Sequence, residues 1–252
     1  MSGDAARPGI WYPLGATIRD GGTNFAVASA AADGMLLCLF EGRGPGDWGR
    51  ETCIPMLDRD AGVWHAFVPG VGAGQAYGYR ATGPFEPAAG LRCNPAKLLL
   101  DPYARAISGE VRFGEEVLGH VPGDPDTPSD LDSAAHVPRS VVTADDYRWA
   151  ADHPRPGRRY ADTVVYEVHV KGFTAAHPDI PPELRGTYAG LAHEAAIAHL
   201  LHLGVTAVEL LPVHHNVPEA FLSDPGLTNY WGYNTIGYFA PHAGYSAAVR
   251  AC

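Results

Sequence analysis

Large apolar residues alternate with small or polar residues along the first hundred residues of the chain. Phe25 and Val27 form one such pair, and Tyr77 and Tyr79 form another. Residues two apart lie on the same face of a β-strand, so each run would present its large side chains on one face. Gly, Pro and Asp separate the runs at intervals typical of a β-sandwich. We expect strands at residues 25–29, 35–40, 63–68, 75–80 and 97–100.

The pattern changes after residue 162. Two near-continuous apolar runs, residues 163–170 and 204–212, flank a stretch with helical spacing. Its periodic residues are Leu191, Ala195, Ala198 and Leu201. Gly204 follows the last of them and is a typical helix stop. Two apolar strands joined through a helix predict a parallel βαβ unit. Because one such unit cannot cover both faces and both edges of its strands, we expect more of the sheet to follow.

Proline and aspartate become frequent between the two patterned regions, from about residue 119 to residue 162. So long a stretch without a helical or strand period is unusual inside one domain and favours a boundary. We therefore expect a β-sandwich at residues 11–118, a connector at 119–162 and a second domain at 163–252. Within the connector, residues 137–142 are apolar enough to pack onto a neighbouring domain.

The overall composition indicates a folded chain that binds a neutral ligand. Of the 252 residues, 46% are hydrophobic and 18% are charged, which excludes a disordered chain. The net charge of −10 repels phosphate backbones and anionic lipids, so neither nucleic acid nor a membrane surface is an expected partner. No apolar run is long enough to span a bilayer and no signal peptide opens the chain, so we expect a cytoplasmic protein.

The four cysteines, Cys38, Cys53, Cys93 and Cys252, lack the CxxC spacing of many zinc sites. In a chain without a secretion signal they are expected to be reduced thiols, and we predict no metal site. The glycine-rich stretches lack the strand-to-helix context and the lysine of a phosphate-binding loop. No cofactor is therefore predicted.

Several segments in both halves are similar to one enzyme family. In the first half they are residues 13–17 (PLGAT), 22–27 (GTNFAV), 77–80 (YGYR) and 94–104 (NPAKLLLDPYA). In the second half they are residues 165–174 (VYEVHVKGFT), 185–191 (RGTYAGL), 203–213 (LGVTAVELLPV) and 229–234 (NYWGYN). In this order they resemble the isoamylase-type, glycogen-debranching branch of the α-amylase superfamily of glycoside hydrolases.

The resemblance implies an immunoglobulin-like β-sandwich, related to starch-binding modules, followed by the first part of an incomplete (β/α)8 barrel. It also implies hydrolysis of α-1,6 branch linkages in glycogen or limit dextrin by a retaining pair of carboxylates. In the family these carboxylates lie on the fourth and fifth barrel strands, so no catalytic residue is expected in this chain, which would be inactive alone. Two alternatives are a non-catalytic α-glucan-binding fragment and the front part of a trehalohydrolase or branching enzyme.

Four residues after the second barrel strand are the sugar contacts that the resemblance implies. Tyr230, Trp231 and Tyr233 would lie at the C-terminal end of the barrel, where (β/α)8 enzymes build their sites. The apolar face of a sugar ring stacks on such rings, and Tyr233 matches the family tyrosine beneath the sugar beside the scissile bond. His214 matches the histidine after the family's Leu-Leu-Pro-Val and would approach the same sugar. The alternative for the aromatic residues is packing at the barrel mouth.

Other conspicuous residues have structural interpretations. Glu167 and Glu209 lie in the predicted strands but not at the family's catalytic positions, so we expect neither to act as an acid or a base. His169 is expected to be a hydrogen-bonded structural residue. Four aromatic residues of the sandwich would form either its core or a glucan platform, and their alternation with small residues favours the core. They are Trp64, Tyr77, Tyr79 and Phe85.

Overall fold

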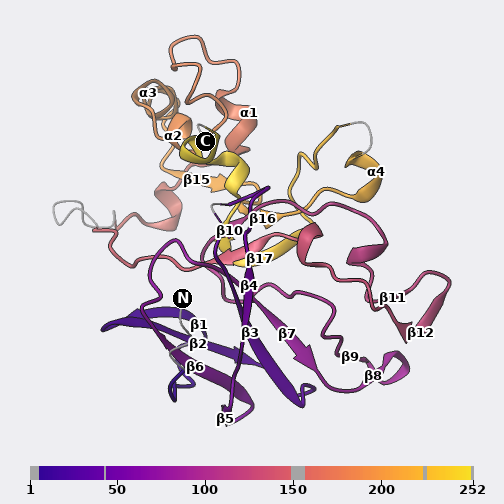
Figure 1. Cartoon of the computed structure of the whole chain (residues 1–252). Helices are drawn as coiled ribbons and strands as arrows, with labels where there is room; N and C mark the ends of the chain where they lie inside the picture. The colour runs from indigo at the N-terminus through magenta and orange to yellow at the C-terminus, as the bar shows by residue number, and fades with distance from the viewer. Residues whose placement is uncertain (1–5, 43, 149–156, 224–225, 251–252) are drawn as a thin grey trace. The chain divides into compact units, whose positions relative to one another are not determined.

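The computed structural model describes residues 6–42, 44–148, 157–223 and 226–250 (Figure 1). The chain divides into two compact units. One consists of residues 1–144 with residues 236–241, and the other of residues 145–235 with residues 242–252. Most of strand β17 (Thr235–Pro241) therefore belongs to the first unit, although it follows most of the second unit in sequence.

The two larger sheets of the first unit are antiparallel, with strand orders β1-β2-β6-β5 and β10-β13-β7-β3-β4. The strands of the first sheet are β1 (Gly15–Arg19), β2 (Gly22–Ala28), β5 (Asp58–Asp60) and β6 (Val63–Pro69). Those of the second are β3 (Gly34–Phe40), β4 (Glu51–Pro55), β7 (Ala76–Thr82), β10 (Ile107–Ser108) and β13 (Arg139–Val141). One buried cluster joins side chains of β2 and β6 to side chains of β3 and β7, so the unit is a sandwich.

The alternation of apolar residues predicts the long strands of this sandwich correctly. Four of the predicted strands are confirmed by β2, β3, β6 and β7, whereas residues 97–100 form only one bridge, between Leu99 and Tyr79. Trp64, Tyr77 and Tyr79 are buried in the cluster, as the core interpretation predicted. Phe85 is half-buried in the short strand β8 (Phe85–Glu86), which pairs with β9 (Leu91–Arg92).

On two of these strands, side chains that point away from the core are also buried, and they make polar contacts. On β2, the buried Asn24 side chain holds the backbone of Ile10, and Arg7 pairs with Phe67 of β6. On β7, the buried Arg80 guanidinium donates to Glu51 and Asp132, and these hydrogen bonds raise the pKa of Arg80. β2 and β7 are therefore buried on both faces, which a simple alternation does not predict.

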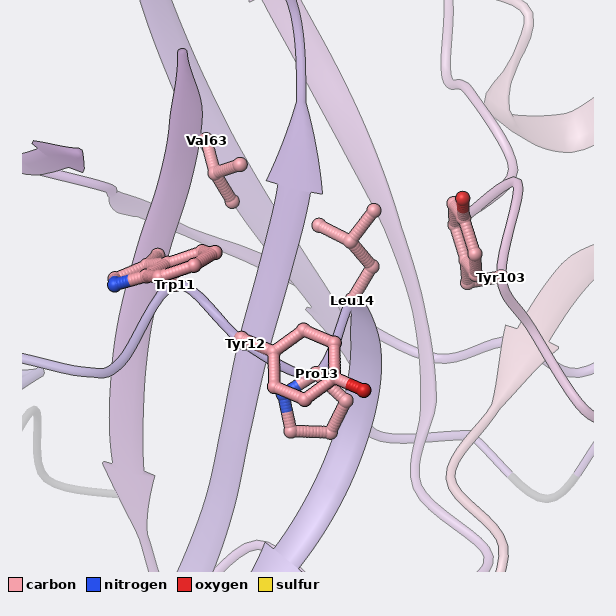
Figure 2. A pocket seen from close by; sticks show the side chains of 6 residues that line it. All are labelled: Trp11, Tyr12, Pro13, Leu14, Val63 and Tyr103. Atoms are coloured by element: carbon pink, nitrogen blue, oxygen red, sulfur yellow. The ribbon is translucent and has the colours of Figure 1, made fainter. Parts of the chain in front are cut away.

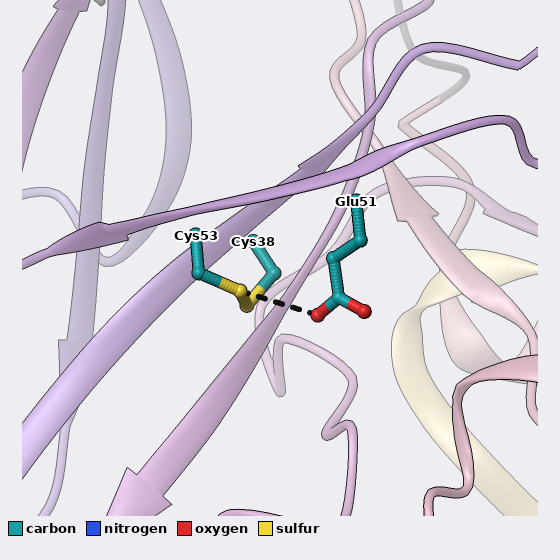
Figure 3. A group of neighbouring side chains, drawn as sticks. All are labelled: Cys38, Glu51 and Cys53. Carbon is teal, nitrogen blue, oxygen red and sulfur yellow. Dashed lines mark hydrogen bonds between the residues drawn. A yellow bond between two sulfur atoms is a disulfide. The ribbon is translucent and has the colours of Figure 1, made fainter.

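Cys38 on β3 and Cys53 on β4 lie opposite each other in register, with Cα atoms 4.1 Å apart and their sulfurs joined in a disulfide (Figure 3). The expectation of reduced thiols is therefore wrong for this pair, because residues opposite each other on neighbouring strands can be close enough to bond whatever their sequence spacing. Glu51 Oε1 lies 3.2 Å from Cys53 Sγ, but sulfurs bonded to each other are not thiolate ligands for a metal. Cys93 is a free thiol, and Cys252 lies outside the described residues.

Part of the expected connector belongs to the first unit. A hairpin of β11 (His120–Val121) and β12 (Asp124–Pro128) comes first, and β13 then pairs with both β10 and β7. Val142, which follows β13, is buried in the sandwich core. The first segment of the unit accordingly runs to residue 144 rather than to 118. Strands this short show no period, so a proline-rich and aspartate-rich composition hides them.

The second unit begins with the predicted βαβ arrangement. Its parallel strands are β14 (Val165–Val168) and β15 (Ala207–Leu210), connected through α1 (Val170–Thr174), α2 (Tyr188–Leu191) and α3 (Glu194–His202). Gly204 has a φ of 75° and its N–H donates to Leu201 O, so it ends the helical segment as predicted. The buried face of α3 carries Ala196 and Leu200, whereas Leu201 is 67% exposed, so the helical phase expected from the sequence is wrong.

Short elements complete the described chain. They are the strand β16 (His214–Asn216), the helices α4 (Ala220–Ser223) and α5 (Ala247–Arg250), and the 3-10 helices at Pro87–Ala89, Glu115–Val117, Ala134–His136, Tyr160–Asp162 and Ala243–Tyr245. Among the described residues, no helix is both long enough and apolar enough to cross a membrane.

Candidate functional site

The carboxyl ends of β14 and β15 lie at the same edge of their sheet. The two strands pair in parallel from Val165 opposite Ala207 to Val168 opposite Leu210, and Leu211 N–H then donates to Val168 O. Loops that follow parallel strands meet at this edge, which is where α/β folds place their ligands. The candidate site is built from the residues that follow these two strands.

His169, the first residue after β14, connects the strand to the later aromatic loop. Its Nδ1 accepts the backbone N–H groups of Lys171 (3.0 Å) and Gly172 (3.1 Å), so it caps α1. The neutral ring therefore carries its proton on Nε2, which donates to Tyr230 O at 2.6 Å. The His169 and Tyr230 rings stack with centroids 3.9 Å apart and planes 8° apart. His169 is thus a hydrogen-bonded structural residue, as predicted, and it positions one of the candidate sugar contacts.

A glycine makes room for Tyr230. A Cβ atom built on Gly172 would lie 2.1 Å from the Tyr230 hydroxyl oxygen, closer than real Cβ contacts come. On another side of His169, the Tyr245 hydroxyl lies 3.2 Å from Nε2. His169, Gly172 and Tyr245 therefore together fix where the aromatic loop begins.

The turn of the aromatic loop is held by Asn229 and Gly232. Asn229 Oδ1 accepts Gly232 N–H at 2.9 Å, and Asn229 Nδ2 donates to the Glu219 carboxylate at 3.2 Å. Gly232 has a φ of 78°, and a Cβ atom there would meet Pro212 and Asn216 at 3.1–3.3 Å. Only glycine adopts this conformation at little cost. The two aromatic residues beside Gly232 are thereby turned out of the loop.

The expected sugar contacts differ in how much of each side chain is accessible. Tyr230 packs on His169 and meets Trp231 edge to face, with centroids 5.3 Å apart. Trp231 is 58% exposed and Tyr233 is 70% exposed. The structure therefore brings Tyr230 and Trp231 into contact and leaves broad aromatic faces open. Such faces bind the apolar side of a pyranose ring and discriminate little against its hydroxyls.

His214 lies at the start of β16. Its side chain is exposed, and its carbonyl oxygen accepts from Asn216 Nδ2 at 3.1 Å. The next residue, His215, is buried, and its ring lies 5.4 Å from the His242 ring. The two adjacent histidines thus differ in burial, as neighbouring residues of a strand do.

Three ring residues that sequence reasoning missed lie behind the aromatic loop. Tyr245 packs edge to face on His169 and on His242, and Tyr188 OH donates to His242 O at 3.2 Å. Burial lowers the pKa of His242 and raises that of Tyr188 to about 12, because both charged forms lose hydration. These groups are therefore neutral at pH 7. The sequence offered one indirect clue to this cluster, because His169 and the aromatic loop both follow predicted parallel strands and so were expected at the same edge of the sheet.

The two carboxylates in the parallel strands lie opposite each other. Glu167 pairs in register with Glu209, and both side chains are exposed. Neither carboxylate belongs to the ring cluster around His169, so they add no acid or base to the candidate site.

Comparisons with known proteins cover both units. Residues 13–104 match the family described as carbohydrate-binding module 48 (isoamylase N-terminal domain). The chain is 50% identical over 247 residues to the glycogen operon protein GlgX homolog of Mycobacterium tuberculosis (strain ATCC 25618 / H37Rv), covering 97% of this chain and 33% of that protein. It is 47% identical over 235 residues to the glycogen debranching enzyme of Yersinia pestis, covering 93% and 34%. The chain thus spans about one third of the length of these relatives.

Solved pullulanase structures share the fold. The pullulanase of Bacillus acidopullulyticus matches with a TM-score of 0.66 at 24% identity, covering 93% of this chain and 25% of that chain. The pullulanase of Paenibacillus barengoltzii in complex with maltohexaose and alpha-cyclodextrin matches with a TM-score of 0.65 at 24% identity, covering 93% and 33%. At this identity the likeness concerns the fold alone.

Proposed function

We propose that this chain, a homologue of glycogen debranching enzymes whose residues 13–104 match carbohydrate-binding module 48, forms the front part of such an enzyme. The complete enzyme would hydrolyse α-1,6 branch linkages in glycogen or limit dextrin. The high identity over nearly the whole chain supports this reaction over those of trehalohydrolases and branching enzymes. A cytoplasmic location stays our prediction.

The chain would contribute a sandwich that extends to residue 144, a connector from there to residue 162, and the first strands of a (β/α)8 barrel (163–252). The barrel assignment is supported by the parallel pairing of β14 with β15 through helices. It is also supported by the exposed apolar residues of both strands, among them Val165, Val208 and Leu210, which further barrel elements would cover.

A retaining glycosidase needs two carboxyl groups about 5–5.5 Å apart, one as nucleophile and one as general acid and base. We propose that the part of the relatives outside the matched third supplies this pair. The chain's own residues would bind and orient the sugar. Tyr233 would stack beneath the sugar next to the scissile bond, Tyr230 and Trp231 would extend the aromatic surface, and His214 would approach the sugar hydroxyls.

The main structural support for these sugar contacts is the way the aromatic loop is held. The loop with Tyr230, Trp231 and Tyr233 is fixed by His169 at the carboxyl edge of two parallel strands, yet it leaves its rings open. Rigid support beneath open rings is the arrangement that orients a sugar at low entropic cost.

The proposal can be tested with a chimaera. This chain would replace the matching third of the Yersinia pestis glycogen debranching enzyme, and release of α-1,6-linked branches from limit dextrin would be measured. We expect activity, and we expect Tyr233→Ala to lower kcat/KM by about tenfold through loss of ring stacking. Tyr160→Ala, which removes a tyrosine that is 96% exposed, is the matched control and should leave kcat/KM unchanged.

Two results would contradict the proposal. A folded chimaera without debranching activity would contradict the assignment of the chain to this enzyme. An active chimaera in which Tyr233→Ala and Tyr160→Ala behave alike would contradict the role of Tyr233 while leaving the assignment intact.

A further inference from the structure

Three potential metal ligands lie together on two neighbouring strands of the sandwich. They are Cys38 of β3 and Glu51 and Cys53 of β4 (Figure 3). One ligand atom from each, a sulfur or a carboxylate oxygen, lies within 4.8 Å of the other two. Ligand atoms that share one tetrahedral zinc ion lie about 3.6–3.8 Å apart. Because the two sulfurs are bonded to each other in this structure, the cluster can hold an ion only after that bond has been reduced.

The backbone places these side chains without help from the sulfur–sulfur bond. β3 and β4 pair in continuous register over residues 36–40 and 51–55, with Cys38 opposite Cys53. Glu51 lies two residues before Cys53 and therefore on the same face of β4. On its other side, β3 is paired along its length with β7. Reduction of the disulfide therefore leaves the three ligands side by side on a paired sheet.

Arg80 orients the carboxylate ligand. Its Nε donates to Glu51 Oε1 at 2.7 Å, and its Nη2 donates to Glu51 Oε2 at 2.8 Å. The Arg80 side chain is itself held by burial and by a second carboxylate, that of Asp132. Each carboxylate oxygen has two lone pairs, so Oε1 can accept from Arg80 and still bind an ion beside Cys53 Sγ, which is 3.2 Å away. Hydrogen bonds of this kind to a ligating carboxylate strengthen metal sites.

The two cysteines differ in how accessible they are. Cys38 is fully buried, whereas Cys53 is exposed on the outermost strand of its sheet. A reductant or a metal ion can therefore reach the cluster from the side of Cys53. A buried thiolate is costly without a cation beside it, so reduced Cys38 gains most from an ion that both sulfurs share.

Two thiolates and one carboxylate favour zinc over other common ions. Magnesium and calcium take oxygen ligands, and copper(I) takes soft sulfur ligands without a carboxylate. Zinc accepts sulfur and oxygen together in a tetrahedral arrangement. Three protein ligands leave one position open, and water can fill it because Cys53 is exposed.

We propose that this cluster is a redox-gated zinc site, which is a disulfide in the oxidised chain and binds Zn²⁺ in the reduced chain. The proposal does not rest on the debranching reaction. It extends the sequence analysis, in which the spacing of the cysteines predicted no metal site, because opposed positions on paired strands do not show in that spacing.

The switch between the two forms is a thiol–disulfide exchange. One thiolate of a dithiol reductant attacks Cys53 Sγ, the sulfur–sulfur bond breaks, and Cys38 leaves with the electron pair and takes up a proton. The second thiol of the reductant then closes its own disulfide and frees Cys53. The reductant has thus given two electrons and two protons, and Zn²⁺ displaces the two thiol protons when it binds. A disulfide oxidant takes the two electrons back and releases the ion.

The test is zinc binding by the 252-residue chain with Cys93→Ser and Cys252→Ser, in which only the two cysteines of the cluster remain. The chain is reduced with a phosphine, separated from it without air, and titrated with Zn²⁺ against a chromogenic chelator. We expect one zinc ion per reduced chain with release of about two protons, and no zinc on the same chain as the disulfide. Co²⁺ should give thiolate-to-metal charge-transfer absorption with the reduced chain only.

Two variants assign the ligands. Cys53→Ser should raise the Kd for Zn²⁺ by about a hundredfold, and Glu51→Gln should raise it by about tenfold. Because Cys53 is exposed, its replacement leaves the fold intact even where loss of the Arg80 contact in Glu51→Gln does not. Glu86→Gln is the matched control, since Glu86 is an exposed strand residue of the same unit outside the cluster. Circular dichroism verifies that each variant is folded.

Any of three results would overturn the site. The first is a disulfide that the phosphine reduces only when the chain is unfolded. The second is a reduced, folded chain that binds no Zn²⁺. The third is a Cys53→Ser variant that binds Zn²⁺ as tightly as the parent chain and the Glu86→Gln control.

Discussion

The two units differ in how completely the apolar residues of their strands are buried. In the first unit, Phe25, Leu37 and Tyr77 are fully buried between two sheets. In the second unit, Val165 is 56% exposed and Val208 is 42% exposed, although both lie in near-continuous apolar runs of the sequence. The described strands of the first unit therefore enclose a core of their own, whereas in β14 and β15 several apolar side chains stay exposed and only Val168 is buried.

This difference follows from the kind of sheet that each unit uses. Antiparallel strands joined by short turns can form two facing sheets within about a hundred residues. Parallel strands need a crossover for each addition and are stable when both faces are covered. Order at the carboxyl edge of β14 comes instead from polar and ring contacts around His169. An apolar run therefore predicts a strand whose side chains are stable when covered, but it does not show that this chain itself covers them.

Removing one leucine from each unit tests this difference with the largest expected effect. Leu37→Ala should lower the free energy of unfolding by about 3 kcal/mol, because it leaves a cavity in a closed core. Leu201→Ala should change it by less than about 0.5 kcal/mol, because that side chain is mostly exposed. Urea denaturation followed by circular dichroism measures both, and equal losses would remove the distinction between the units.

Limited proteolysis should separate the units. Arg148 and Arg158 are exposed and lie outside every described helix and strand, between the last strand of the sandwich and β14. We expect trypsin to cut first at the exposed arginines and to leave a resistant fragment that contains the sandwich. Mass spectrometry of the early fragments identifies the cuts. First cuts between residues 15 and 142, or uniform resistance of the whole chain, would contradict the division.

His169 tests whether polar contacts order the second unit. His169→Ala removes the acceptor for two N–H groups of α1 and the donor to Tyr230, and should cost about 1 kcal/mol. His169→Asn keeps a capping oxygen and loses the ring stacked on Tyr230. Hydrogen exchange of residues 229–233 should therefore rise in both variants, while exchange in α1 rises only with alanine. Unchanged exchange at 229–233 would show that the loop does not depend on His169.

The smallest predicted effect is a pH dependence confined to the second unit. Burial lowers the pKa of His242 in the folded chain below its ordinary value of 6.5, so the unfolded chain takes up this proton first as the pH falls. The second unit should lose stability as the pH falls from about 6.5 toward the lowered pKa, and His242→Gln should remove this loss. Hydrogen exchange at pH 7.5 and 5.5, corrected for intrinsic rates, measures the effect. The same acid sensitivity in both forms would show another group to be responsible.

Local patterns in the sequence account for much of the fold. The alternation around Phe25 and Tyr77 predicted strands and core, and the apolar runs after residue 162 predicted the parallel pair. The buried face predicted for α3 was wrong because apolar residues lie on more than one side of this helix. Ala196 and Leu200 are the ones that pack against the rest of the unit. Periodicity thus identified the elements better than it identified their buried sides.

Features that depend on register or on distant segments were not predictable in this way. The Cys38–Cys53 disulfide requires the exact pairing of β3 with β4, which composition does not specify. The pocket that Trp11 and Tyr103 line (Figure 2) depends on the backbone conformation of Gly15. The four candidate sugar contacts, in contrast, came from a short motif and a family resemblance. Of these four, only Tyr230 contacts His169, which lies 61 residues away in the sequence and holds the start of the aromatic loop.

Hydrogen exchange, measured by mass spectrometry, in the 252-residue chain and in the chimaera with the remaining two thirds of the debranching enzyme tests whether β14 and β15 begin a larger barrel. We predict that β14 and β15 exchange at least about tenfold more slowly in the chimaera, because new barrel elements cover them, while β3 and β7 exchange at the same rate in both. Equal exchange of β14 and β15 in the two proteins would contradict the claim that this unit is the beginning of a larger barrel.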